Sequence, residues 1–176
     1  MKPLKEKLED TINKWERSVS LQKINSLLKS EVTDTNFDPF SVLDQLQKSS
    51  VSPDIAIINT LLDTTSRLKD FKNFNRLCEL ICSEEGISHN LPPPNVITYN
   101  VILKGYNMEM VKRDLYDKSD KSVLEQTVKK VERTVNHMIA SGLNPNDITL
   151  NTIIDIMVDA GNFDLAWKYY DEMEKV

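Results

Sequence analysis

The sequence repeats one short string three times, and this repetition constrains the fold more than any other feature. Each copy begins with a proline followed by Asp or Asn, and another Asn lies six residues after the proline. A pair of branched aliphatic residues comes next. The copies start at Pro53, Pro94 and Pro145. Self-similarity at a spacing of some tens of residues is typical of stacked repeat architectures.

Each copy also carries the signals of a helix start. In the second copy, three prolines and Asn95 precede apolar residues that recur at helical spacing. The valines and isoleucines do not alternate with polar residues as they would in strands, so an all-α fold is predicted. We expect helices over residues 4–19, 21–28, 38–48, 54–67, 70–85, 96–116, 124–139, 148–158 and 163–176.

Side chains that face the core should recur every three or four residues along these helices. For five of the helices, the expected inward residues are Phe40, Leu43, Leu46 and Gln47; Ile57, Ile58, Leu61 and Leu62; Phe71, Phe74, Leu77, Cys78 and Ile81; Val128, Val131, Val135 and Met138; and Phe163, Ala166, Trp167, Tyr170 and Met173.

One pair of helices cannot bury its apolar face alone, so a solenoid of stacked antiparallel pairs in one continuous domain is expected. The segments would be a capping helix (1–19), a degenerate helix-pair repeat (20–54) and three repeats (55–95, 96–146 and 147–176). We expect lengthened helices in the middle repeat, between Lys104 and Val128, and an incomplete last repeat.

The charge and the cysteines narrow the range of functions. A net charge of -5 and a pI of about 5.1 do not favour a sequence-blind nucleic-acid binder, although they leave a local basic groove open. Cys78 and Cys82 are four residues apart in one expected helix, which disfavours a disulfide between them and suits a reducing compartment. No apolar run reaches the ~18 residues of a membrane span.

The repeated string resembles the motif of the pentatricopeptide repeat family. Residues 96–100 (Val-Ile-Thr-Tyr-Asn) are similar to the start of that motif, and residues 142–146 (Gly-Leu-Asn-Pro-Asn) to its end. Ala166, Tyr170 and Met173 resemble its second helix. The similarity covers about residues 20–176 and implies a right-handed superhelical solenoid. The Trp, Leu-Gly and Tyr signature of tetratricopeptide repeats is not found.

The resemblance implies selective binding of single-stranded RNA, in which each repeat presents one base to two or three side chains. The residues it assigns to the base edge are Asn59, Asn100 and Asn151, assisted by Asn95 and Asn146, with Asn25 and Asp54 in the degenerate repeat. The residues it assigns to the base face are Ala56, Ile97 and Ile148. The family's pairing of two asparagines with a pyrimidine implies a pyrimidine-rich target.

Plainer interpretations stay open for these residues. The repeated asparagines could bond a neighbouring helix, and Ile97 and Ile148 could belong to the core. Cys78 and Cys82 with His89 or His137 could ligate a metal, but no second ligand pair follows, so no metal or other cofactor is expected. No catalytic motif is found, and we expect no enzymatic activity.

Two other functions compete with RNA reading. The acidic charge and irregular repeat lengths also suit a scaffold for protein partners, and the repeats could target a catalytic domain of a larger protein. A basic edge formed by Lys129, Lys130 and Arg133 could contact phosphate. The resemblance implies a mitochondrial or plastid protein. The acidic residues near the N-terminus do not suit a transit peptide, so a cytoplasmic location stays open. Because no apolar run is long enough to span a membrane, no membrane association is expected.

Overall fold

The computed structural model describes residues 4–14, 17–32, 37–83, 90–114 and 121–174. Within these ranges the secondary structure is nine α-helices and no strand, which confirms the all-α prediction. The chain divides into two compact units, Met1–Pro93 and Pro94–Val176. The division falls next to Asn95, close to where the sequence places the start of a new repeat.

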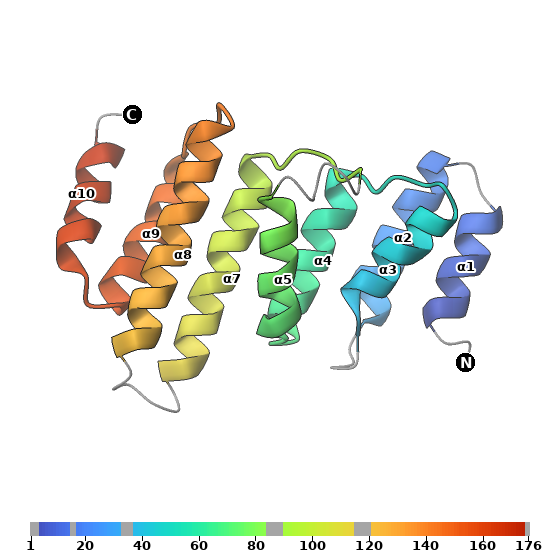
Figure 1. The fold of residues 1–176 in the computed structure, drawn as a ribbon, viewed down its shortest axis with the longest axis horizontal. Coiled ribbons are helices and arrows are strands. Elements are labelled where there is room, and N and C mark those ends of the chain that lie inside the picture. Colours follow the sequence, from blue (N-terminus) through green and yellow to red (C-terminus); the bar gives the residue numbers. More distant parts are fainter. Residues whose placement is uncertain (1–3, 15–16, 33–36, 84–89, 115–120, 175–176) are drawn as a thin grey trace. The chain divides into compact units, whose positions relative to one another are not determined.

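The first unit contains α1 (Leu4–Lys14), α2 (Arg17–Glu31), α3 (Pro39–Lys48), α4 (Ile55–Arg67) and α5 (Phe71–Ile81). Helix α1 packs against α2 and α3, and α4 packs against both α2 and α5. Figure 1 shows α4 and α5 lying side by side as an antiparallel pair. The contact between α2 and α4 joins the first helices of two successive repeats.

The second unit contains α7 (Val96–Asp114), α8 (Lys121–Ala140), α9 (Asp147–Asp159) and α10 (Phe163–Met173). Helix α7 packs against α8 and α9, and α9 also packs against α10 (Figure 1). The same arrangement therefore occurs in both units, because the first helix of one repeat contacts the first helix of the next. Helices α7 and α8 are the longest described, with 19 and 20 residues.

Most of the expected inward residues form the core. All four chosen on α4 and all four chosen on α8 are buried, as are Phe74, Leu77, Cys78 and Ile81 of α5. Tyr99 of α7 is fully buried as well, and its hydroxyl lies 2.7 Å from His137 Nδ1 on α8. Burial of these apolar side chains is the main force that holds the helices together.

Four helices end in the same backbone motif. After α8 the amide of Gly142 donates to Ile139 O, and the amide of Leu143 donates to Met138 O. This pairing satisfies the last carbonyls of the helix and requires a left-handed residue at its centre. Gly142 and Gly161 supply that conformation after α8 and α9, at φ 77° and 69°, while Ser50 and Lys69 supply it after α3 and α4.

The helix expected over residues 4–19 is instead two helices. Helix α1 ends at Lys14 and α2 begins at Arg17, so the proposed boundary at residue 19 falls inside α2. The cause is a change of phase along the apolar stripe. Helix α1 buries Leu8 and Ile12, whereas α2 buries Leu21, Ile24 and Leu28. Continuing the first stripe at helical spacing reaches Gln22 and Lys23, which are polar.

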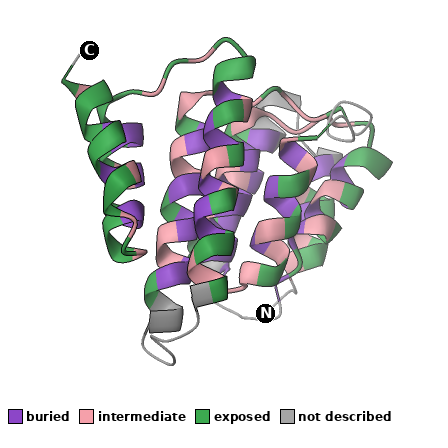
Figure 2. Ribbon diagram, turned by 60° about the vertical axis from the view of Figure 1, so that its left-hand side comes forward, coloured by how far each residue is buried: buried purple, intermediate pink, exposed green. Residues whose placement is uncertain are grey.

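The inward residues expected on α10 are largely wrong. Phe163, Trp167 and Tyr170 are 59%, 65% and 39% exposed, whereas Ala166 and Tyr169 are buried. Figure 2 shows the reason on the helix beside the C mark, where buried residues lie along one side and exposed residues along the other. Because α9 is the main neighbour of α10, only one stripe of this helix is covered.

The inward residues expected on α3 are only partly correct. Leu46 is buried together with Val42, while Gln47 is exposed. Phe40 and Leu43 instead line a cavity of about 790 Å³, together with Gln47 and residues of α5. Within it, the guanidinium of Arg76 lies 4.2 Å from the centre of the Phe40 ring. Helix α3 therefore turns Phe40 and Leu43 toward this cavity, while Val42 and Leu46 face the core.

Candidate nucleic-acid interface

The three residues assigned to assist base reading all lie at the start of a first helix, and each caps that helix. Asp54 Oδ1 accepts the backbone amide of Ile57 at 2.8 Å. Asn95 and Asn146 accept the amides of Thr98 and Thr149 through Oδ1, each at 3.0 Å. The first amides of a helix have no partner within the helix, so these oxygens stabilise the helix start.

The junction between α7 and α9 brings two of the assigned residues together. Asn100 Nδ2 on α7 donates to Asn146 Oδ1 at the start of α9, over 3.3 Å. Asn100 Oδ1 accepts the hydroxyl of Thr149 at 2.7 Å. The same hydroxyl lies 2.8 Å from Asn146 Oδ1 and accepts the backbone amide of Asn146 at 3.1 Å. Three polar side chains thus form one connected cluster across two repeats.

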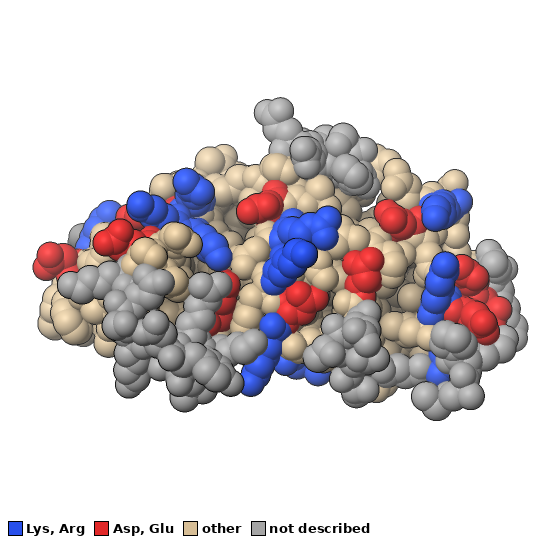
Figure 3. Space-filling model, turned by 60° about the horizontal axis from the view of Figure 1, so that its bottom comes forward, with Lys and Arg blue, Asp and Glu red and all other residues tan. Residues whose placement is uncertain are grey.

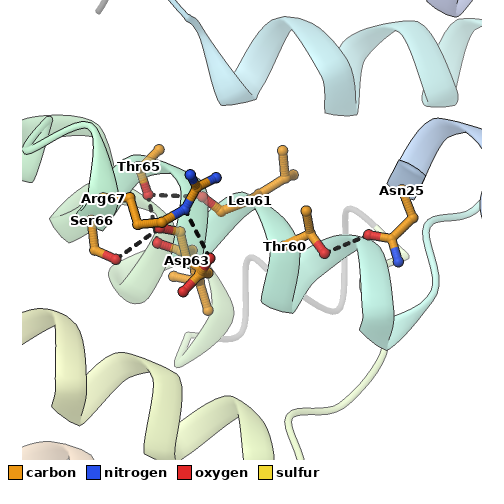
Figure 4. A network of polar contacts seen from close by, with 8 residues as sticks. Asn25, Thr60, Leu61, Asp63, Thr65, Ser66 and Arg67 are labelled. Carbon is orange, nitrogen blue, oxygen red and sulfur yellow. Dashed lines mark hydrogen bonds and ion pairs between the residues drawn. The ribbon is translucent and has the colours of Figure 1, made fainter. Parts of the chain in front are cut away.

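The junction between α2 and α4 is built differently. Asn25 Oδ1 accepts the hydroxyl of Thr60, as Figure 4 shows, and the structure gives no hydrogen bond between Asn25 and Asp54. The two residues assigned as a pair by the resemblance are therefore not joined here. Asp54 instead uses Oδ1 for its own helix cap, which leaves its second oxygen for other contacts.

The remaining assigned asparagines differ in their surroundings. Asn151 on α9 is exposed. Asn59 on α4 is half-buried, and its Oδ1 is buried without a hydrogen-bond partner in the described part of the chain. Asn59 and its assigned assistant Asn95 belong to separate compact units.

The residues assigned to the base face are exposed. Ile97 and Ile148 are each 62% exposed, and Ala56 is exposed too. The interpretation of these isoleucines as core residues is therefore wrong. Each of the three lies three residues before the asparagine of its own helix, a spacing that puts both side chains on one helix face. First helices thus present an apolar group and an amide together.

On the face shown in Figure 3, the charged residues that the structure describes form no single basic groove. Acidic and basic side chains are interspersed on the surface shown in Figure 3. Lys130, one of three residues of the proposed basic edge, donates to the buried Glu109 at 3.2 Å and lies 5.5 Å from the centre of the Tyr106 ring. It therefore links α7 to α8, whereas Lys129 and Arg133 are exposed and accessible to phosphate.

Sequence reasoning missed the role of two threonines. A signal existed for Thr149, because Thr98 and Thr149 occupy the same position of the repeated string, three residues after a capping asparagine. Such spacing is typical of a capping box, in which cap and third residue exchange hydrogen bonds. No comparable pattern marks Thr60, whose contact with Asn25 depends on how α2 packs against α4.

Cys78 is buried and Cys82 is half-buried, and both are free thiols. No disulfide joins Cys78 and Cys82. Among the residues that the structure describes, no group of three or more His, Cys, Asp or Glu side chains could hold a metal ion. His89 lies outside the described residues, and the Nδ1 of His137 faces the hydroxyl of Tyr99. This histidine therefore serves the contact between α7 and α8.

Cys82 should react slowly with alkylating reagents. Burial raises the pKa of its thiol from 9.0 to about 11, so only about one thiol in a thousand is ionised at pH 8. Iodoacetamide labelling followed by mass spectrometry should give a rate that keeps rising with pH through pH 10. A small cysteine peptide serves as the control. A Cys82 rate that levels off near pH 9, as for an exposed thiol, would contradict this expectation.

The fold and the junctions together define a class of protein. Antiparallel helix pairs whose first helices pack against one another, with polar clusters at the junctions, are the architecture of a helical-repeat protein. Residues 41–108 match the family model of the pentatricopeptide repeat domain. These residues thus form a pentatricopeptide repeat region, which confirms the resemblance for this part of the chain, and the match supports a role of this family's kind, which is typically RNA binding.

No curated protein matches the chain. No described helix combines the length and the apolar character that crossing a membrane requires.

Proposed function

We propose that this chain binds single-stranded RNA, prefers pyrimidines, and acts in RNA processing or stability without catalysing a reaction itself. The observation that carries this proposal is the cluster at the α7–α9 junction, where Asn100 and Asn146 are hydrogen-bonded beside the exposed Ile148. An amide can both donate and accept hydrogen bonds. An exposed aliphatic side chain at the same place provides a surface for the face of a base.

The expected strength of binding follows from the small number of such sites. A base that stacks on an aromatic side chain gains ~1–3 kcal/mol, and the residues assigned to the base face here are aliphatic and offer no ring. A chain with few repeats and a net charge of -5 should therefore bind weakly, and more weakly still as salt increases. Any measurement of affinity must begin at low ionic strength.

Titration of labelled oligonucleotides tests the proposal. Fluorescence anisotropy at low salt should show oligo-C and oligo-U binding about tenfold more tightly than oligo-A, since one lost pair of base-edge hydrogen bonds has about that effect. The same sequences as DNA and as duplex RNA are the controls. Equal affinity for all three single-stranded RNAs would contradict base selection, and no binding at low salt would contradict RNA binding altogether.

A second candidate function is protein interaction. The exposed Phe163, Trp167 and Tyr170 form an aromatic face on α10, and the Trp167 and Tyr170 rings meet edge to face at 5.7 Å. Exposed aromatic groups of this kind are common in protein interfaces. Sedimentation of the wild type and of Trp167→Ser distinguishes protein interaction through this face from RNA binding. Self-association through the face should weaken in the variant, whereas its RNA affinity should stay unchanged.

An organellar location, in a mitochondrion or a plastid, completes the proposal and is supported by the family resemblance alone. Imaging of the natural full-length protein with a C-terminal fluorescent tag tests it. A diffuse cytoplasmic signal would contradict an organellar location.

A further inference from the structure

The hydroxyl of Thr149 has a place in the α7–α9 junction that helix capping does not explain. Thr149 is completely buried, yet its hydroxyl contacts Asn100, which belongs to the other helix. We propose that Thr149 is a positioning residue, which fixes the Asn100 amide in the orientation needed to read a base. This inference rests on the proposed function and deepens it.

The orientation of both amides follows from the start of α9. Asn146 Oδ1 accepts the backbone amide of Thr149, a group that can only donate, so the oxygen of Asn146 must face the helix. Asn100 then has to turn its nitrogen toward that oxygen, as the 3.3 Å contact shows. Its own oxygen consequently faces Thr149.

The Thr149 hydroxyl donates its single proton to Asn100 Oδ1. Asn146 Oδ1 already accepts two donors, the amide of Thr149 and Nδ2 of Asn100. Asn100 Oδ1 accepts no donor among the described residues except this hydroxyl, at 2.7 Å. Since the second contact of Asn100 is longer, at 3.3 Å, the hydroxyl is the main restraint on its side chain.

The oriented pair presents donors to a ligand. With both oxygens turned toward α9, Asn146 keeps two N–H groups and Asn100 keeps one that the cluster does not use. A base edge with acceptor atoms side by side complements such a pair. If Asn100 were free to turn, it would offer its oxygen as readily as its nitrogen, and the discrimination between base edges would fall.

The α2–α4 junction offers an internal comparison. Ile57 occupies the position that corresponds to Thr149 in the repeated string, three residues after the cap Asp54. It has no hydroxyl and is completely buried. Asn25 is held from a different position, by Thr60. Positioning of this kind is therefore a property of the α7–α9 junction and not of every repeat in the chain.

The test compares two substitutions of Thr149. Thr149→Val keeps the shape and removes the hydroxyl, whereas Thr149→Ser keeps the hydroxyl. The matched control is Thr152→Val on the same helix, since the Thr152 hydroxyl bonds only within its own helix, to Ile148 O. The readouts are the Asn100 side-chain amide resonances, measured by NMR on the RNA-free protein, and the ratio of oligo-C to oligo-A affinity.

In Thr149→Val the Asn100 resonances should shift and exchange faster with water, and the affinity ratio should fall about three- to tenfold, as for one lost hydrogen bond. Thr149→Ser and Thr152→Val should behave like the wild type. A wild-type ratio in Thr149→Val, or unchanged Asn100 resonances, would overturn the positioning role alone. A wild type that does not discriminate between the two RNAs overturns the proposed function instead.

Discussion

Replacing Tyr99 with alanine should lower the free energy of unfolding of the second unit by about 3–5 kcal/mol. Tyr99 is one of the largest completely buried side chains in the described part of the chain, and it lies where α7 packs against α8. Truncation removes the ring from the core and leaves a cavity. Urea denaturation followed by circular dichroism measures the effect.

Tyr99→Phe is the matched control. It keeps the ring and removes only the hydroxyl that contacts His137, so it should cost about 1 kcal/mol. The difference between the two variants separates packing from hydrogen bonding. If both variants lost the same stability, the polar contact and not the packed ring would be what joins these helices.

The largest functional effect is expected for Ile148→Glu. This change should weaken RNA binding about 10- to 100-fold, since it removes an apolar side chain whose burial against a base would contribute ~1.5–3 kcal/mol and adds a negative charge that repels phosphate. Ile148 is 62% exposed and lies in the first turn of α9, where a carboxylate is favourable. The helix should therefore stay folded, and anisotropy with oligo-C measures the loss.

Ile139→Glu provides the control for charge. Ile139 is 54% exposed on α8, a second helix, so the variant carries the same net charge at an isoleucine of similar exposure. It should bind RNA within about twofold of the wild type, because its new charge lies on a second helix and removes no apolar contact from the first helices. Equal losses in both variants would mean that overall charge, and not the surface of the first helices, governs binding.

The sequence predicted the helices well wherever a capping residue or a left-handed turn marked their ends. Asp54, Asn95 and Asn146 begin helices as expected, and Gly142 follows the end of one. It failed for residues 4–19, where the apolar stripe changes phase without a glycine or a proline to mark the break. Local pattern alone does not show where one helix should become two.

The family resemblance assigned Asn100 and Asn146 to the reading of a base edge, and the structure brings these two residues together. The resemblance also paired Asn25 with Asp54, which the structure does not join. Whether Asn25 can contact Asp54 depends on the position of α2 along the axis of α4. Sequence spacing carries no information about that position. The exposed side of α10 was missed for a similar reason, because periodicity shows a stripe but not how many neighbours cover it.

The cap at the start of each first helix has a consequence for how such a protein can change its target. Asp54, Asn95 and Asn146 hold the first turn of a helix with an atom of the same side chain that the resemblance assigns to a base. Only short side chains with an oxygen can do this well. Few residue types are therefore suitable at this position. A variant that is given another type of residue there to select a different base would lose the cap and destabilise the start of the helix.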